Sequence, residues 1–296
     1  MTDRSMRQFT RREAIAATAS ITALAGCSQG GEPTATGTSE TTTPSPVTNG
    51  LQLWLHPNSG YNTADGSVTE WTDASGSENS MSQSTAERQP TIASGAANGH
   101  DAVQFDGEDD FLLREDTLGI ANDSARTFVI VSRLSDTQAR SPFLMQGRLD
   151  SEGSDSNYYG LEANTYNTAG ERFGLFLVAS AKDTPRRTNT RYNLHILRTT
   201  DFTDISTMEQ STVYYINGGE VSFSGTPGGA RNQFFDGDST AVGGFPYTSS
   251  GSRMHGEIAE VRVYDRAIPD SERRQIENRL IDKYNIGQVP ATVTST

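Results

Sequence analysis

Four carboxylates lie within five consecutive residues, at Asp106-Gly107-Glu108-Asp109-Asp110. Such crowding costs free energy unless water or a cation neutralises the charges. Calcium binds roughly six to eight oxygen ligands, including carboxylates and backbone carbonyls, so Asp106, Asp109 and Asp110 are candidate ligands of a structural Ca²⁺. The alternative, which we favour, is a solvated turn in which Asp106 and Asp109 accept hydrogen bonds from nearby backbone N–H groups. No other cofactor is predicted.

A second set of residues could hold a sugar, since a sugar site combines aromatic faces with polar groups that form hydrogen bonds. Tyr158 and Tyr159 follow a polar loop, Arg148 precedes that loop, and Tyr247 belongs to the loop Phe245-Pro246-Tyr247. These residues are the candidate binding side chains.

Nucleophilic and metal-dependent catalysis have no recognisable motif in the sequence. A Gly-x-Ser-x-Gly elbow is absent, and the histidines, His56, His100, His195 and His255, have no spacing typical of metal ligands. The single cysteine, Cys27, belongs to the N-terminal segment described next. No catalytic residue is therefore predicted.

Residues 1–27 read as an export signal with three parts: four arginines, an apolar run of about ten residues, and Leu24-Ala25-Gly26-Cys27. The pair Arg11-Arg12 resembles a twin-arginine signal, which exports folded proteins. The final four residues resemble a lipobox, which implies cleavage before Cys27 and lipidation of its thiol. We therefore expect a lipoprotein held at the outer face of the cytoplasmic membrane, with its domain outside the cell.

Residues 28–49 are rich in Ser, Thr, Pro and Gly and predict a disordered stalk. The folded domain is expected over 50–288, and 289–296 are expected to form a disordered tail. The net charge is −13, from 24 basic and 37 acidic residues, and only two of the basic residues are lysines. This charge argues against a nucleic-acid partner. It also resembles the composition of halophilic proteins, whose acidic repulsion is screened by salt.

Short apolar runs between turn residues predict about a dozen strands and an all-β fold. Asn217-Gly218, between two such runs, predicts a tight hairpin. One helix is expected after Pro269, with Ile276, Leu280 and Tyr284 on its apolar face. The expected strands are Leu51–Leu55, Val68–Thr72, Ala102–Phe105, Thr127–Leu134, Phe143–Gln146, Tyr158–Glu162, Phe173–Ala179, Tyr192–Arg198, Thr212–Ile216, Glu220–Phe223, Thr240–Gly243 and Ile258–Tyr264.

Five landmarks together resemble the laminin-G-like domains of the concanavalin A-like lectin/glucanase superfamily. They are Leu51–Leu55, Val68–Gly76, Val103–Leu112, the hairpin at 215–218, and Gly256–Ile268 with the helix that follows it. The resemblance spans residues 51–286. It implies a two-sheet antiparallel jelly-roll sandwich with one C-terminal helix. It does not imply one activity, because the fold hosts lectins, adhesion modules and hydrolases.

Glucanases of that superfamily carry carboxylates that alternate along one strand. The nearest pair here, Glu257 and Glu260, is three residues apart, which predicts opposite faces and a solvent or edge position. We therefore expect a binding module, not an enzyme, with a glycan or cell-envelope polymer as its ligand. The alternatives are an adhesion or spacer module with a protein partner, and a polysaccharide-active enzyme with non-standard residues.

Overall fold

The computed structural model describes residues 45–121, 123–148, 157–164, 171–177, 180–203, 205–223, 238–246 and 252–287. The predictions for the export signal, Cys27, Tyr247 and the C-terminal tail lie outside the described residues. Within the predicted stalk, residues 45–49 contact the domain: Val47 packs beside α2, and its carbonyl accepts a hydrogen bond from the Tyr264 hydroxyl at 3.1 Å.

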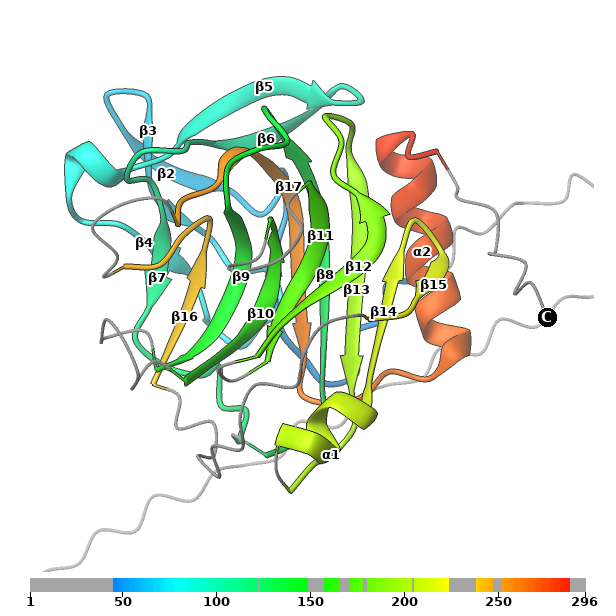
Figure 1. The fold of residues 1–296 in the computed structure, drawn as a ribbon. Helices are drawn as coiled ribbons and strands as arrows, with labels where there is room; N and C mark the ends of the chain where they lie inside the picture. The colour runs from blue at the N-terminus through cyan, green and yellow to red at the C-terminus, as the bar shows by residue number, and fades with distance from the viewer. Residues whose placement is uncertain are drawn as a thin grey trace, which may run out of the picture. The chain divides into compact units, whose positions relative to one another are not determined.

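The described residues form one antiparallel sheet of seventeen strands (Figure 1). The strands are β1 Leu51–Leu55, β2 Tyr61–Ala64, β3 Ser67–Trp71, β4 Met81–Ser82, β5 Thr91–Ala97, β6 His100–Asp106, β7 Leu112–Arg114, β8 Arg126–Leu134, β9 Ser141–Arg148, β10 Asn157–Ala163, β11 Arg172–Leu177, β12 Ser180–Arg187, β13 Asn193–Thr199, β14 Thr212–Ile216, β15 Gly219–Val221, β16 Ser239–Val242 and β17 His255–Tyr264. The helices are the 3₁₀ turn η1 Ala86–Arg88, α1 Ile205–Gln210 and α2 Asp270–Tyr284.

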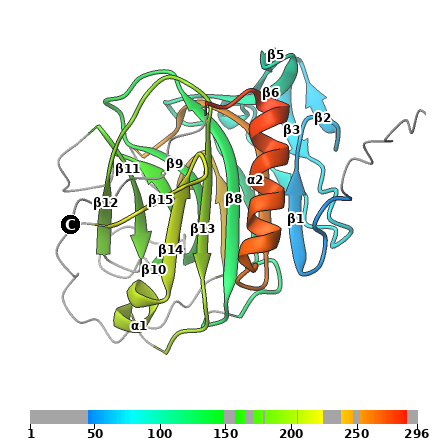
Figure 2. The ribbon, with the colours of Figure 1, turned by 90° about the vertical axis from the view of Figure 1, so that its right-hand side faces the viewer.

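The two-sheet jelly roll predicted from the sequence is wrong. Short strands join what would be separate sheets: β16 pairs with both β7 and β9, and β4 pairs with both β3 and β7. β12 and β15, at the far ends of the pairing, come close to each other, so the sheet is nearly closed into a barrel-like form (Figure 2). β16 was predicted, as Thr240–Gly243, but β4 and β7 have only two and three residues, too few to show a period. The pairing of β16 with two strands is a long-range feature that no local pattern reveals.

The main core lies inside the curled sheet, where aromatic and branched side chains such as Trp71, Phe128 and Tyr159 are fully buried. A second apolar layer lies between the sheet and α2, which crosses the outer side of β8, β13 and β17 (Figure 2). A third, smaller cluster covers the outer side of β9, β10 and β16. This third layer borders the candidate site.

The predictions for α2 and for the hairpin are confirmed. The helix begins after Pro269 and buries Ile276, Leu280 and Tyr284. Asn217 and Gly218 have φ angles of 52° and 82°, the positive values of the predicted tight turn between β14 and β15.

Candidate functional site

A groove with a volume of about 470 Å³ lies beside β4, η1, β7 and the segment after β16. Figure 1 shows these strands together at one side of the sheet. Its lining combines hydroxyl, amide and charged side chains with a small apolar patch of Phe111, Leu113 and Pro246. The polar lining residues are Ser80, Ser82, Gln83, Ser84, Thr85, Arg88, Arg114 and Glu115. Such a combination, at this size, is typical of a site for a small polar ligand.

Gln83 organises the floor of the groove. Its side-chain amide donates to the Phe111 carbonyl at 3.3 Å and accepts from the Thr85 backbone N–H at 3.0 Å. Its own carbonyl accepts from Gln89 at 2.9 Å. The backbone N–H of Phe111 donates to the Arg88 carbonyl at 3.3 Å, which ties η1 to the start of β7. The floor is therefore held by hydrogen bonds that leave the hydroxyls of Ser82, Ser84 and Thr85 at the surface.

Two arginines, Arg88 and Arg114, line the groove, and a third, Arg253, lies against the ring of Phe111. Arg114 pairs with Asp116 at 2.7 Å and donates to the Glu78 carbonyl at 3.0 Å. Arg253 is buried, and its guanidinium lies 5.2 Å from the centre of the Phe111 ring. Arg88 is exposed, and no side chain in the described part of the chain pairs with it. Burial, and then the nearby charge of Arg88, lower the pKa of Arg253.

The groove adjoins the aromatic cluster on the outer side of β9 and β10. Tyr158 stacks on Phe176 at 4.2 Å between ring centres and meets Phe245 at 4.6 Å. Leu113, which lines the groove, also packs against this cluster. The two regions therefore form one continuous surface of the sheet.

A buried ion pair supports the cluster. Arg140 contacts Glu162 at 2.8 Å and donates to the Tyr158 hydroxyl at 3.2 Å. Burial raises the pKa of Glu162, an effect that the Arg140 charge opposes. Among the residues that the structure describes, none forms a hydrogen bond with the other oxygen of Glu162, Oε1.

The structure separates the residues predicted to bind sugar. Tyr158 is 8% exposed and lies in the aromatic cluster. Tyr159 points the other way, into the main core, where its hydroxyl contacts Thr199 at 2.5 Å, so its ring offers no face to a ligand. Arg148 pairs with Asn157 in the β9–β10 register, and the described residues include its backbone alone.

The acidic turn brings its three aspartates together. One carboxylate oxygen each of Asp106, Asp109 and Asp110 lies within 4.8 Å of the others. Asp106 accepts from the Glu108 backbone N–H at 2.8 Å, and Asp110 accepts from the Asp106 backbone N–H at 3.0 Å. Asp110 thus takes the local role that we expected of Asp109. Burial raises the pKa of Asp110 to about 7. Carboxylates at these distances fit a calcium ion, and their backbone bonds also fit the solvated turn.

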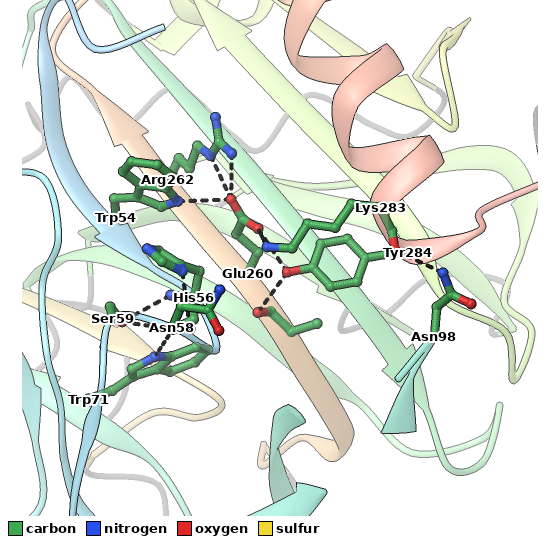
Figure 3. Close-up of polar contacts among 11 residues, drawn as sticks. Trp54, His56, Asn58, Ser59, Trp71, Asn98, Glu260, Arg262, Lys283 and Tyr284 are labelled. Atoms are coloured by element: carbon green, nitrogen blue, oxygen red, sulfur yellow. Dashed lines mark hydrogen bonds and ion pairs between the residues drawn. The ribbon is translucent and has the colours of Figure 1, made fainter. Parts of the chain in front are cut away.

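A separate polar network joins β1, β17 and α2 around Glu260 (Figure 3). The Glu260 carboxylate accepts from Trp54 at 2.8 Å, from Arg262 at 2.5 Å, and from both Lys283 and Tyr284 at 2.8 Å. Burial alone would raise the pKa of Glu260, but Arg262 and Lys283 hold it at about 2. A buried carboxylate with so many partners is suited to holding elements together and has no lone pair left for a ligand.

The predicted placement of Glu257 and Glu260 is also wrong. A β-bulge lies between Ile258 and Glu260, so both glutamates share the side of β17 that faces α2, and both are buried. Glu257 there pairs with Arg133 and accepts a hydrogen bond from Tyr192. The spacing of the two glutamates in the sequence could not reveal their shared face, because the extra residue of a bulge reverses the alternation of side chains between the two faces of a strand.

Sequence reasoning missed most of the groove. Ser82, Arg88 and Arg114 lie in a two-residue strand, a single 3₁₀ turn and a three-residue strand, and none of these has a readable period. The signals that could have been noted were the serine run after Asn79 and the two arginines, Arg88 and Arg114, on either side of the acidic turn.

No protein-family model matches this sequence, and no curated protein does. Among solved structures, the chain is similar to the Trypanosoma rangeli sialidase in complex with sialic acid, with a TM-score of 0.54 and 18% identity over 79% of this chain and 33% of that one. It is also similar to a mutant of that sialidase displaying trans-sialidase activity, with a TM-score of 0.53 and 16% identity over 78% and 33%. This chain therefore spans about a third of the length of the sialidases that it matches.

A carbohydrate-binding module of a Ruminococcus gnavus sialidase, bound to sialyllactose, matches at a TM-score of 0.37 and 18% identity, over 50% of this chain and 80% of that one. At these identities the likeness concerns the fold. The prediction that the chain is not an enzyme is corrected by the sialidases among its structural neighbours. The argument for that prediction was that Glu257 and Glu260 lie on opposite faces of their strand, and the bulge in β17 shows that this is wrong.

Proposed function

We propose that the chain binds carbohydrate in the groove between β4, η1 and β7. The observation that carries the proposal is the lining: surface hydroxyls of Ser82, Ser84 and Thr85 beside an apolar patch. Sugars present hydroxyl groups around an apolar ring face, and such a surface complements both. The Trypanosoma rangeli sialidase of similar fold is in complex with sialic acid, a sugar, and we extend that ligand class to this chain.

The test is a glycan array probed with the full chain, followed by titration of the glycans that bind. Ser82→Trp fills the groove from an exposed position and should abolish binding. Ser94→Trp, on exposed β5 outside the groove, is the matched control and should bind as the parent does. Equal affinity of the two variants would exclude the groove, and an array without any binding would exclude the proposed function.

Hydrolysis is the second candidate, favoured by the sialidase neighbours and by two carboxylates near the aromatic cluster. Glu162 and Asp183 flank Gly174 in the register of β10, β11 and β12, two strands apart. Two strand intervals separate the backbones of the two residues by about 9.5 Å. This backbone spacing is close to the distance between the two carboxyl groups of inverting glycosidases, about 6.5–9.5 Å. Glu162 is fully buried, however, so we rank binding first. Release of reducing ends that Glu162→Gln abolishes would establish hydrolysis there.

We also propose attachment to the outer face of the membrane through a lipid on Cys27. The support is the sequence Leu24-Ala25-Gly26-Cys27 after an apolar run. Among the described residues, no helix is long and apolar enough to cross a membrane. Cys27→Ser should release the protein into the medium or leave the precursor uncleaved. If this variant fractionates with membranes as the parent does, the attachment proposal fails.

A further inference from the structure

The groove concentrates positive charge in a strongly acidic protein. The whole chain carries a net charge of −13, yet both Arg88 and Arg114 line the groove beside its apolar patch. Glu115 is the acidic residue that lines the groove, and Asp116 is engaged by Arg114. Two guanidinium groups at one small depression make an anion the complementary ligand.

Arg88 is positioned for a ligand and is not used by the fold. It ends η1, and its carbonyl is fixed by the backbone N–H of Phe111 at 3.3 Å, so the residue is anchored while its side chain stays exposed. Within the described residues its guanidinium has no partner. An exposed arginine on a well-anchored backbone, facing a groove, contributes more to binding than to folding.

Arg114 lines the same groove, and contacts within the protein hold its guanidinium in one orientation. Its Nε contacts Asp116 at 2.7 Å, and its Nη1 donates to the Glu78 carbonyl at 3.0 Å. These two contacts fix the plane of the guanidinium. In the described part of the chain, Nη2 has no partner. A guanidinium held in this way loses little entropy when it binds a carboxylate.

We infer that the groove selects saccharides that bear a carboxylate, with Arg88 and Arg114 holding that carboxylate and Leu113 packing against the sugar ring. Arginine matches the planar, two-oxygen geometry of a carboxylate better than lysine does. This inference rests on the proposed function and names the ligand class of the same site.

The experiment compares each acidic sugar with its own neutral form. Oligogalacturonate, oligoalginate and an oligosaccharide ending in sialic acid are each titrated beside their methyl esters, which keep the sugar and remove the charge. The titrations use the full chain at the lowest salt at which it stays folded. At least one acid should bind about tenfold or more tightly than its ester, since a hydrogen bond to a charged group has roughly this effect.

Two variants separate a contact from a general charge effect. Arg88→Gln should weaken binding of the acid about tenfold or more and leave the ester unchanged. Arg191→Gln removes the same charge from an exposed position outside the groove and should change neither. Equal weakening by the two variants would show long-range attraction only and would overturn the inference.

The remaining outcomes are also decisive. If acids and esters bind equally well, the carboxylate inference fails while carbohydrate binding stands. If a sulfated glycan without carboxylates binds as tightly as the uronates, the groove selects negative charge and the carboxylate assignment fails. If none of these sugars binds, and the array is also empty, both the inference and the proposed function fail.

Discussion

Asp110 shows how one residue can separate the two interpretations of the acidic turn. Burial, opposed by a backbone hydrogen bond from Asp106 and assisted by the charges of Asp106 and Asp109, raises its pKa to about 7. A carboxyl whose pKa is higher in the folded state takes up protons on folding. The stability that it contributes is therefore complete at low pH and declines as the pH rises from about 4 to 7.

The first prediction concerns Asp110→Asn. The amide keeps an acceptor for the Asp106 N–H and removes the charge, so the variant should melt at a higher temperature than the parent at pH 8. At pH 3, where the carboxyl is largely protonated in both the folded and the unfolded state, the two should melt at nearly the same temperature. Thermal unfolding at both pH values measures this, with Asp65→Asn, on an exposed turn, as the control.

Calcium would reverse the result. A bound cation would stabilise the parent by RT ln(1 + [L]/Kd), about 2.7 kcal/mol at a hundredfold excess over Kd. Asp110→Asn would then destabilise the protein, and EDTA at constant ionic strength would lower the parent's Tm. We expect EDTA to have no effect. A Tm decrease that Asp109→Asn removes would establish the calcium site instead.

Among the elements, β1, β17 and α2 are held together by the Glu260 carboxylate (Figure 3). Glu260→Gln would leave Arg262 buried without a counter-charge, and breaking a buried pair in this way costs about 3–5 kcal/mol. We expect a loss of this size in denaturant unfolding at pH 7. Glu220→Gln, on the exposed side of β15, should stay within about 0.5 kcal/mol of the parent.

The effect of Glu260 should also depend on pH. A carboxyl whose folded pKa is about 2, below its ordinary value, stabilises the fold fully above about pH 4.5, and this stabilisation is lost as the pH falls toward 2. The difference between the parent and Glu260→Gln should therefore shrink from pH 5 to pH 3. A difference that stays constant over this range would contradict the charge pairing.

At the scale of elements, the sequence predicts what depends on local pattern. Helix α2 follows from Pro269 and its apolar stripe, and the β14–β15 hairpin follows from Asn217-Gly218. The polar strand β12, Ser180–Arg187, has no apolar alternation and was not predicted. The bulge before Glu260 and the pairing of β16 with two strands depend on contacts between distant segments. Local sequence patterns therefore could not predict the face on which Glu260 lies, the single sheet or the groove.

For the whole molecule, the net charge of −13 makes stability depend on salt. Self-repulsion opposes compactness in dilute buffer, and the Debye length falls to about 3 Å at 1 M salt. The Tm should therefore rise between low and molar KCl. A flat or falling Tm would contradict the interpretation of this composition as salt adaptation.

The groove is the central claim, and hydrogen–deuterium exchange with and without a glycan from the array tests it most directly. The account predicts that bound glycan slows exchange in residues 80–88 and 111–115, which surround the groove, while β13 and α2, on another side of the sheet, exchange as before. Protection confined to β13 or α2, or no protection by a glycan that binds, would contradict the account.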